Sequence, residues 1–190
     1  MTLTITEQLD NFVSSYVELG EPDKLVIPYD EEWPSECYIE NESGMASNHG
    51  NSKERDMVAW RPVRQTETLS FSNVEDAMSL TLDPQYCVFF TRYFSDSLKA
   101  TAPQGECELL QVWNKDDFER LQQNLIGHLL MKQRLNQAPT LFFGLTDEED
   151  FILTVVNETG EVALEQVGKP AQKIFAPSLA HFIADLSPRL

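Results

Sequence analysis

The clearest architectural signal in the chain is PTLFFGLTDEEDFILTVVNETGEVALEQV, residues 139–167. It contains three short segments rich in β-branched and aromatic residues, at 140–145, 151–156 and 161–167. Acidic residues separate the first two segments, and the sequence Asn-Glu-Thr-Gly, which suits a hairpin, separates the last two. Consecutive strands joined by such short turns pair in antiparallel order. The stretch therefore predicts an antiparallel meander.

Amphipathic helices are predicted before and after this meander. The longest starts after Asn114, a candidate N-cap, and runs to about Leu135, with its apolar side chains recurring on one face. Shorter segments at 6–19 and 178–186 have the same helical spacing. This order of elements predicts an α+β fold with a single domain over residues 1–190. We expect an antiparallel sheet with the helices grouped against one of its faces.

The other segments are assigned from weaker patterns. Short strands are predicted at 37–40, 57–60, 86–94 and 109–113, and a short helix at 74–82. Residues 21–35 contain three prolines and the acidic run at 30–32, so they are expected to form a loop. Residues 43–55 are rich in Ser, Asn and Gly and predict a mobile surface loop.

The strongest bias in composition is acidic. The chain has 31 Asp and Glu residues against 14 Lys and Arg, a formal net charge of −17. The first part is the most acidic, with 13 acidic and 3 basic residues up to Trp60. Such a field repels nucleic acid and anionic lipid and attracts basic surfaces, so neither nucleic-acid binding nor direct lipid insertion is expected. Two interpretations stay open: acidity that serves solubility, or recognition of a basic partner.

The sequence contains none of the common catalytic motifs: a phosphate-binding loop, a dinucleotide glycine pattern, HExxH or GxSxG. His49 falls in the predicted mobile loop, and His128 and His181 are expected to be partly buried structural residues. The acidic runs at 30–32 and 147–150 lack the ligand pattern of a calcium loop. The three cysteines lack metal-ligand spacing and are expected to be reduced and buried. We therefore expect a protein that is not an enzyme, with no cofactor and no metal site.

The chain shows no sign of membrane insertion or export. Its longest apolar runs, at 125–131 and 140–145, are far shorter than the roughly 20 residues that cross a bilayer as a helix. Residues 1–6 lack the basic start and apolar core of a secretory signal. We therefore expect a cytoplasmic protein.

The long predicted helix and its surroundings resemble the Syd family. The similarity is carried by LLQVWN at 109–114, DFERLQ at 117–122, NLIGHL at 124–129 and PTLF at 139–142. Shorter matches support it, namely PSEC at 34–37, WRP at 60–62, GEV at 160–162 and LAHF at 179–182. The resemblance thus covers nearly the whole chain. It departs from the family at 43–55, which is longer than expected.

The resemblance implies a SUKH-like fold and a binding function. Syd proteins are expected at the bacterial inner membrane, peripheral on its cytoplasmic side, with a soluble cytoplasmic pool. There they bind the cytosolic loops of SecY, the channel of the protein translocase, and regulate or monitor poorly assembled SecY. Such loops are rich in Lys and Arg, which agrees with the acidity of this chain. The wider SUKH group includes many toxin-immunity proteins, so an acidic toxin inhibitor is the alternative function.

We expect the partner to bind at the acidic run and at the start of the long helix. The candidate residues are Asp30, Glu31, Glu32, Trp33, Glu36, Asp116 and Asp117. Trp33 is the candidate anchor, because a few packed aromatic side chains carry much of the binding energy of an interface. The other interpretation makes Trp33 a core residue and the carboxylates ordinary surface charge. For the motif at 124–128, Gly127 is expected to let a neighbouring element approach closely, and the alternative is direct contact of the motif with SecY.

Overall fold

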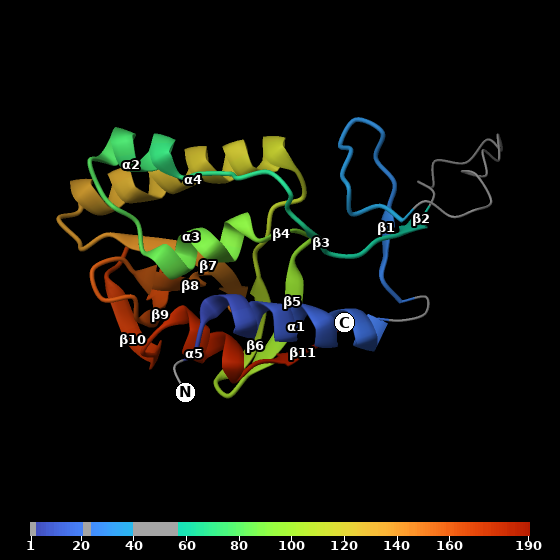
Figure 1. Cartoon of the computed structure of the whole chain (residues 1–190). Coiled ribbons are helices and arrows are strands. Elements are labelled where there is room, and N and C mark those ends of the chain that lie inside the picture. The colour runs from blue at the N-terminus through green and yellow to red at the C-terminus, as the bar shows by residue number, and fades with distance from the viewer. Residues whose placement is uncertain (1–2, 21–23, 40–56) are drawn as a thin grey trace.

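The computed structural model describes residues 3–20, 24–39 and 57–190 of the chain, and Figure 1 shows their arrangement. The helices are α1 (Ile5–Gly20), α2 (Ser72–Met78), α3 (Pro84–Thr91), α4 (Lys115–Arg134) and α5 (Leu179–Ala184). The strands are β1 (Val26–Pro28), β2 (Met57–Ala59), β3 (Val63–Arg64), β4 (Tyr93–Phe94), β5 (Leu98–Ala102), β6 (Gly105–Leu109), β7 (Thr140–Thr146), β8 (Phe151–Val156), β9 (Val162–Gln166), β10 (Ala171–Ala176) and β11 (Ser187–Pro188).

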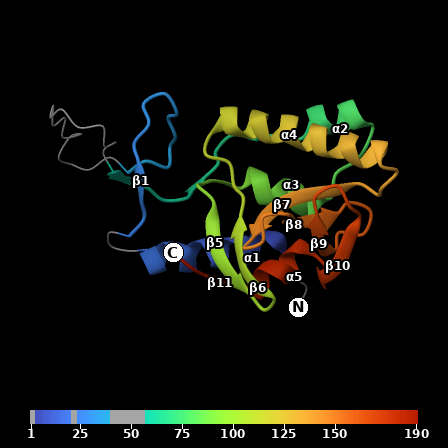
Figure 2. The same cartoon turned by 180° about the vertical axis from the view of Figure 1, so that it is seen from behind.

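A seven-stranded antiparallel sheet forms the centre of the molecule. Its order is β10-β9-β8-β7-β6-β5-β11, and two small sheets, β1-β2 and β3-β4, lie outside it. Neighbouring strands pair in antiparallel order throughout. The rotated view in Figure 2 shows the helices packed around this sheet, with the β1–β2 unit projecting at one end. The predicted α+β class is confirmed.

The predicted meander is confirmed as β7, β8 and β9, and the sheet extends beyond it on both sides. β10 continues the meander, and the β5–β6 hairpin pairs with β7 through β6. The sequence analysis missed β5 although its residues alternate: Leu98 and Ala100 are buried, whereas Lys99 and Thr101 are exposed. The predicted strand at 109–113 is only the end of β6. After Leu109 the chain leaves the sheet toward α4.

Helices pack on both faces of the sheet, so the expectation of a single covered face was wrong. The neighbouring β9 residues Leu164 and Glu165 face opposite ways, as strand geometry requires. Glu165 meets Lys132 of α4, with a separation of 2.7 Å between charged atoms. Leu164 lines a narrow cleft together with Phe182 of α5. The sheet is thus the middle layer of the molecule.

The predicted strand at 86–94 was wrong, because most of it is helix α3. Asp83 caps this helix by accepting a hydrogen bond from the Tyr86 amide at 3.0 Å, and Pro84 starts it. Aromatic residues favour strands in general. Here they recur at helical spacing, and Tyr86, Phe89 and Phe90 are fully buried. The cap signal at Asp83-Pro84 therefore outweighed the strand propensity.

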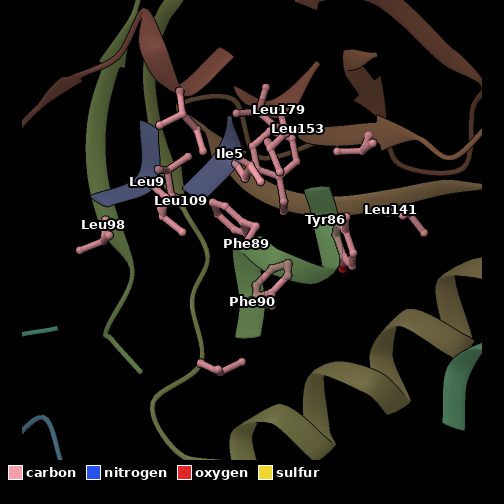
Figure 3. Packing of buried hydrophobic residues seen from close by; sticks show 14 of the residues in the cluster. Ile5, Leu9, Tyr86, Phe89, Phe90, Leu98, Leu109, Leu141, Leu153 and Leu179 are labelled. Atoms are coloured by element: carbon pink, nitrogen blue, oxygen red, sulfur yellow. The ribbon is translucent and has the colours of Figure 1, made fainter. Parts of the chain in front are cut away.

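The core lies between α3 and the sheet. Figure 3 shows Phe89 and Phe90 of α3 within the buried cluster that also contains Leu109 of β6 and Leu153 of β8, and the two phenyl rings meet edge-on with centroids 4.8 Å apart. Phe89 also meets Phe143 of β7 edge-on, with ring centroids 5.7 Å apart. Burial of such large apolar side chains stabilises the fold.

The remaining elements differ in length from their predictions. The helix predicted at 74–82 is the shorter α2, which ends at Ser79 in a left-handed conformation with φ 50°. The helix predicted at 178–186 is α5, capped by Ser178, after which β11 returns to pair with β5. Of the segment predicted as a strand at 37–40, the described residues 37–39 form an isolated bridge between Tyr38 and Trp60, whereas β1 arises inside the predicted loop at 21–35.

Two further expectations concern the segment at 43–55 and membrane-spanning helices. The loop predicted at 43–55, with His49, lies outside the described residues. Among the helices of the described segments, none has the length and apolar content needed to cross a membrane.

Candidate acidic interface

The N-terminus of α4 is built by reciprocal capping. The side chain of Asn114 accepts a hydrogen bond from the Asp117 amide at 2.9 Å, and the Asp117 carboxylate accepts one from the Trp113 amide at 2.8 Å. This arrangement confirms Asn114 as the N-cap. Carboxylates in the first turn of a helix are favoured by its dipole. Asp117 is therefore held in a fixed position, and Asp116 beside it is exposed.

The acidic segment that follows β1 is fastened to the same helix end. Asn114 Nδ2 donates to the Pro34 carbonyl at 2.8 Å, and Trp113 Nε1 donates to the Trp33 carbonyl at 3.2 Å. The Ser35 hydroxyl donates to the Trp113 carbonyl at 2.6 Å. Three hydrogen bonds thus join two segments about 80 positions apart in the sequence. Because of them, the two predicted groups of acidic residues lie at one end of the molecule.

Trp33 is half-buried, so it is neither a fully enclosed core residue nor a fully exposed anchor. Its indole ring lies under the guanidinium of Arg120, 4.6 Å from the ring centroid to Cζ. Such a cation–π pair is worth about 0.5–1 kcal/mol at an exposed site. Trp33 packs against the core without being fully enclosed. It therefore has an accessible edge beside the acidic residues.

The predicted carboxylates differ in exposure and in hydrogen bonding. Glu31, Glu32, Glu36 and Asp116 are exposed. Asp30 is partly buried in the turn, where its carboxylate accepts from the Glu32 amide at 3.1 Å. The four exposed carboxylates are available to a partner, whereas Asp30 and Asp117 already accept hydrogen bonds from backbone amides.

The sequence analysis missed two carboxylates of this surface, Asp96 and Glu108. Asp96 is exposed, yet the surrounding protein raises the pKa of its carboxyl, first through desolvation and then through the charges of Glu108 and Asp117. Asp96 precedes β5 and Glu108 lies on β6, opposite Lys99. Neither residue belongs to an acidic run, so only the strand pairing reveals their proximity.

Backbone pairing brings Asp96 close to the start of α4, because the Ser95 amide before it donates to the Val112 carbonyl at 2.9 Å. Burial, and to a lesser degree the charges of Glu36 and Asp96, raise the pKa of the Cys37 thiol to about 11. Eight carboxylates lie in the 30–36 segment, around the β5–β6 hairpin and at the start of α4. We call them the acidic surface: Asp30, Glu31, Glu32, Glu36, Asp96, Glu108, Asp116 and Asp117.

Two expectations about the middle of α4 have different outcomes. His128 is partly buried as expected, with Nε2 3.0 Å from the Thr140 hydroxyl, and burial lowers its pKa. The expectation for Gly127 was wrong. A Cβ atom at Gly127 would have no heavy atom of a neighbouring element within 4 Å, so none of the described elements packs closely there.

The other polar candidates show structural roles. His181 is exposed, contrary to expectation, and its Nδ1 lies 2.7 Å from the Ser178 hydroxyl. Cys37 and Cys107 are buried free thiols, whereas Cys87 is partly exposed. Within the described segments, no group of three or more His, Cys, Asp or Glu residues is arranged to hold a metal ion.

Comparison with known proteins gives one consistent family. The family model described as Syd protein (SUKH-2) matches residues 6–188. The chain is 65% identical to a protein named Protein Syd from Alteromonas mediterranea over 188 residues, which cover 99% of this chain and 98% of the relative. It is 42% identical to Protein Syd from Pseudoalteromonas atlantica over 190 residues, with 99% and 98% coverage. Protein Syd from Colwellia psychrerythraea is also 42% identical, with 97% and 92% coverage.

Proposed function

The chain belongs to the Syd (SUKH-2) family, and from this premise we propose that it binds the basic cytosolic loops of the translocase channel SecY through the acidic surface. The observation that carries the proposal is the fastening of the 30–36 segment to the start of α4. These hydrogen bonds bring the carboxylates of that segment and of the helix start together at one end of the molecule, where Asp117 also acts on Asp96. In this role the protein regulates or monitors poorly assembled SecY.

Electrostatics supports a partner of this kind. Cytoplasmic loops of membrane proteins carry an excess of Lys and Arg. Opposite charge between the surfaces raises the association rate and selects the partner, while packed contacts supply much of the affinity. Desolvation, and then the charges of Glu108 and Asp117, raise the pKa of Asp96, and an approaching cation would stabilise this carboxylate.

The same charge bears on where the protein acts. A net charge of −17 opposes direct adhesion to the anionic cytoplasmic leaflet. Basic loops that protrude from a membrane protein overcome this repulsion locally. The proposal therefore places the protein on the cytoplasmic side of the inner membrane only when it is bound to SecY, with a free pool in the cytoplasm. It acts as a binding protein, not as an enzyme.

The test is binding of synthetic SecY cytosolic-loop peptides, followed by fluorescence anisotropy at rising salt. A triple variant, Glu31→Gln/Glu32→Gln/Glu36→Gln, removes three exposed charges of the acidic surface. With about 0.5 kcal/mol for each rim charge, the affinity falls about tenfold. The matched control is Asp147→Asn/Glu148→Gln/Glu149→Gln, which removes three charges from the β7–β8 turn and leaves binding nearly unchanged.

Two results would overturn the proposal. One is the absence of binding by the unmodified protein at low ionic strength, where attraction between the charges is strongest. The other is an equal loss of affinity in the two triple variants, which would mean that net charge alone attracts the peptides.

A further inference from the structure

The small unit made by β1, β2 and the segment around Ile39 has an apolar face turned to solvent. β1 and β2 pair with Val26 opposite Ala59 and Pro28 opposite Met57. On the other side of β2, the Ile39 amide donates to the Ala59 carbonyl at 2.9 Å. We call the surface made by these five residues the outer apolar face.

Strand alternation separates this face from the core. Ile27 of β1, which pairs with Val58, packs against the core, and the buried Trp60 after β2 meets Trp113 edge-on at 5.9 Å between ring centroids. Met57 and Ala59, which alternate with Val58 and Trp60 along the chain, point to the opposite, outer side. On the outer face, Met57 is 56% exposed, Val26 46% and Ile39 37%. A two-sided apolar sheet in a small unit is unusual, because antiparallel sheets commonly alternate an apolar inner face with a polar outer one.

The outer apolar face stands out against the rest of the surface. Three of the nine large apolar side chains recorded as exposed in the described segments lie on it. The five residues include no charged side chain, although 24% of the chain is charged. Contiguous exposed apolar surface that is rimmed by polar residues marks interaction sites. Solubility alone would favour charged residues at these outward positions.

The charges at the two ends of this face differ in sign. The acidic turn at 30–32 begins two positions beyond Pro28, at the end where Pro28 pairs with Met57. At the opposite end, Lys24 lies two positions before Val26 and is exposed, and so is Arg61 after β2. A bound segment is therefore oriented, with its cations at the acidic end and its apolar side chains along the face.

We propose that the outer apolar face binds aliphatic side chains of a partner segment whose Lys or Arg residues contact the 30–32 turn. The inference rests on the proposed function and sharpens it: the partner segment has basic residues next to an aliphatic run, rather than basic residues alone. A second copy of this chain is a less suitable occupant, because two bodies of −17 repel each other.

The experiment uses two labelled synthetic peptides of equal charge. One joins a block of lysines to a block of leucine and valine, and the other has serine in place of each leucine and valine. The face is altered with Val26→Thr/Ile39→Thr/Met57→Gln, which keeps net charge and strand propensity. The control is Val167→Thr/Ile174→Thr near β10, where the exposures of 55% and 48% are similar.

The expected result is selective for the aliphatic block. The unmodified protein and the control variant bind the aliphatic peptide about tenfold more tightly than the serine peptide, a difference of about 1.4 kcal/mol. The altered-face variant binds the two peptides with equal affinity. That affinity matches the affinity of the unmodified protein for the serine peptide. Near-ultraviolet circular dichroism of Trp60 and Trp113 shows that the small unit remains folded.

Other results separate the inference from the proposed function. Equal binding of both peptides by the unmodified protein, weakened by salt, overturns the inference and leaves the proposed function in place. Binding of neither peptide at low salt overturns both. A dimer in sedimentation that dissociates in the altered-face variant assigns the face to a second copy and also overturns the inference.

Discussion

Nζ of Lys132 lies 2.7 Å from Oε1 of Glu165, and both side chains are almost completely closed off from solvent. Lys132 also donates to the Lys169 carbonyl at 2.8 Å and to Gln137 Oε1 at 3.1 Å. The other oxygen of Glu165 accepts from the Thr154 hydroxyl at 3.2 Å. This network holds the C-terminal half of α4 against β9. Since α4 is a single helix, these contacts also help to position its N-terminus in the acidic surface.

Breaking this ion pair on one side is expected to destabilise the protein strongly. Glu165→Gln leaves the Lys132 ammonium buried without its counter-charge, which costs about 3–5 kcal/mol. The double variant Lys132→Met/Glu165→Leu removes both charges and is expected to cost clearly less. Urea unfolding of the three proteins measures the difference. A single variant as stable as the unmodified protein would show that the pair contributes nothing.

His128 makes the stability depend on pH near neutrality. Burial lowers its pKa below the ordinary value of 6.5, Glu165 raises it and Lys132 lowers it. Below pH 6.5 the unfolded chain therefore binds a proton that the folded protein does not take up until its lower pKa is reached. Stability is full above about pH 6.5 and decreases as the pH falls, by at most about 1.4 kcal/mol per pH unit.

The measurement compares urea unfolding of the unmodified protein and of His128→Gln at about pH 7 and about pH 5.5. The variant is expected to lose less stability between the two pH values. An equal loss of stability in the two proteins would show that other groups cause the pH dependence. Asp96 is a poor candidate for such a group, because its pKa is raised from 3.8 and a carboxyl of this kind costs stability as the pH rises.

The sequence revealed the parts of the fold that depend on local signals. The meander followed from alternating segments and turn residues, and α4 followed from Asn114 and its apolar stripe. The helix α3 was missed because the Asp83-Pro84 cap was given less weight than the aromatic residues after it. Helices on both faces were missed because sequence spacing does not report which side of a sheet a connection crosses.

The candidate site was only partly visible in the sequence. The acidic run and the start of α4 could be found because their charges are consecutive or lie at a helix N-terminus. That they meet depends on hydrogen bonds between segments about 80 positions apart, such as that from Asn114 to Pro34. Asp96 and Glu108 are isolated in the sequence, so only the tertiary structure adds them to the acidic surface.

Asn114→Ala is expected to loosen the acidic segment as well as the helix. Loss of the cap costs about 1 kcal/mol of stability. The substitution also removes the donor to the Pro34 carbonyl, so Trp33 gains freedom beside Arg120. Urea unfolding measures the first effect, and quenching of tryptophan fluorescence by iodide measures the second. Asn114→Asp serves as the control, because it keeps the cap but cannot donate to Pro34. Quenching that is unchanged in both variants would contradict the coupling.

Asp96→Asn is expected to stabilise the fold and weaken binding at the same time. At neutral pH desolvation, and then the charges of Glu108 and Asp117, disfavour the Asp96 carboxylate, so an uncharged isostere stabilises the fold by about a few tenths of a kcal/mol. The gain disappears at about pH 3.5, where the carboxyl is protonated in the unmodified protein as well.

The same substitution removes one charge from the surface proposed to bind a basic partner, so affinity for a lysine-rich peptide is expected to fall about twofold to threefold. Glu158→Gln, an exposed charge in the β8–β9 turn, is the control that changes neither quantity. Opposite signs in stability and binding would identify a charge retained for recognition at a cost to the fold. If both quantities fell together, Asp96 would instead be a structural residue, and its raised pKa would carry no functional meaning.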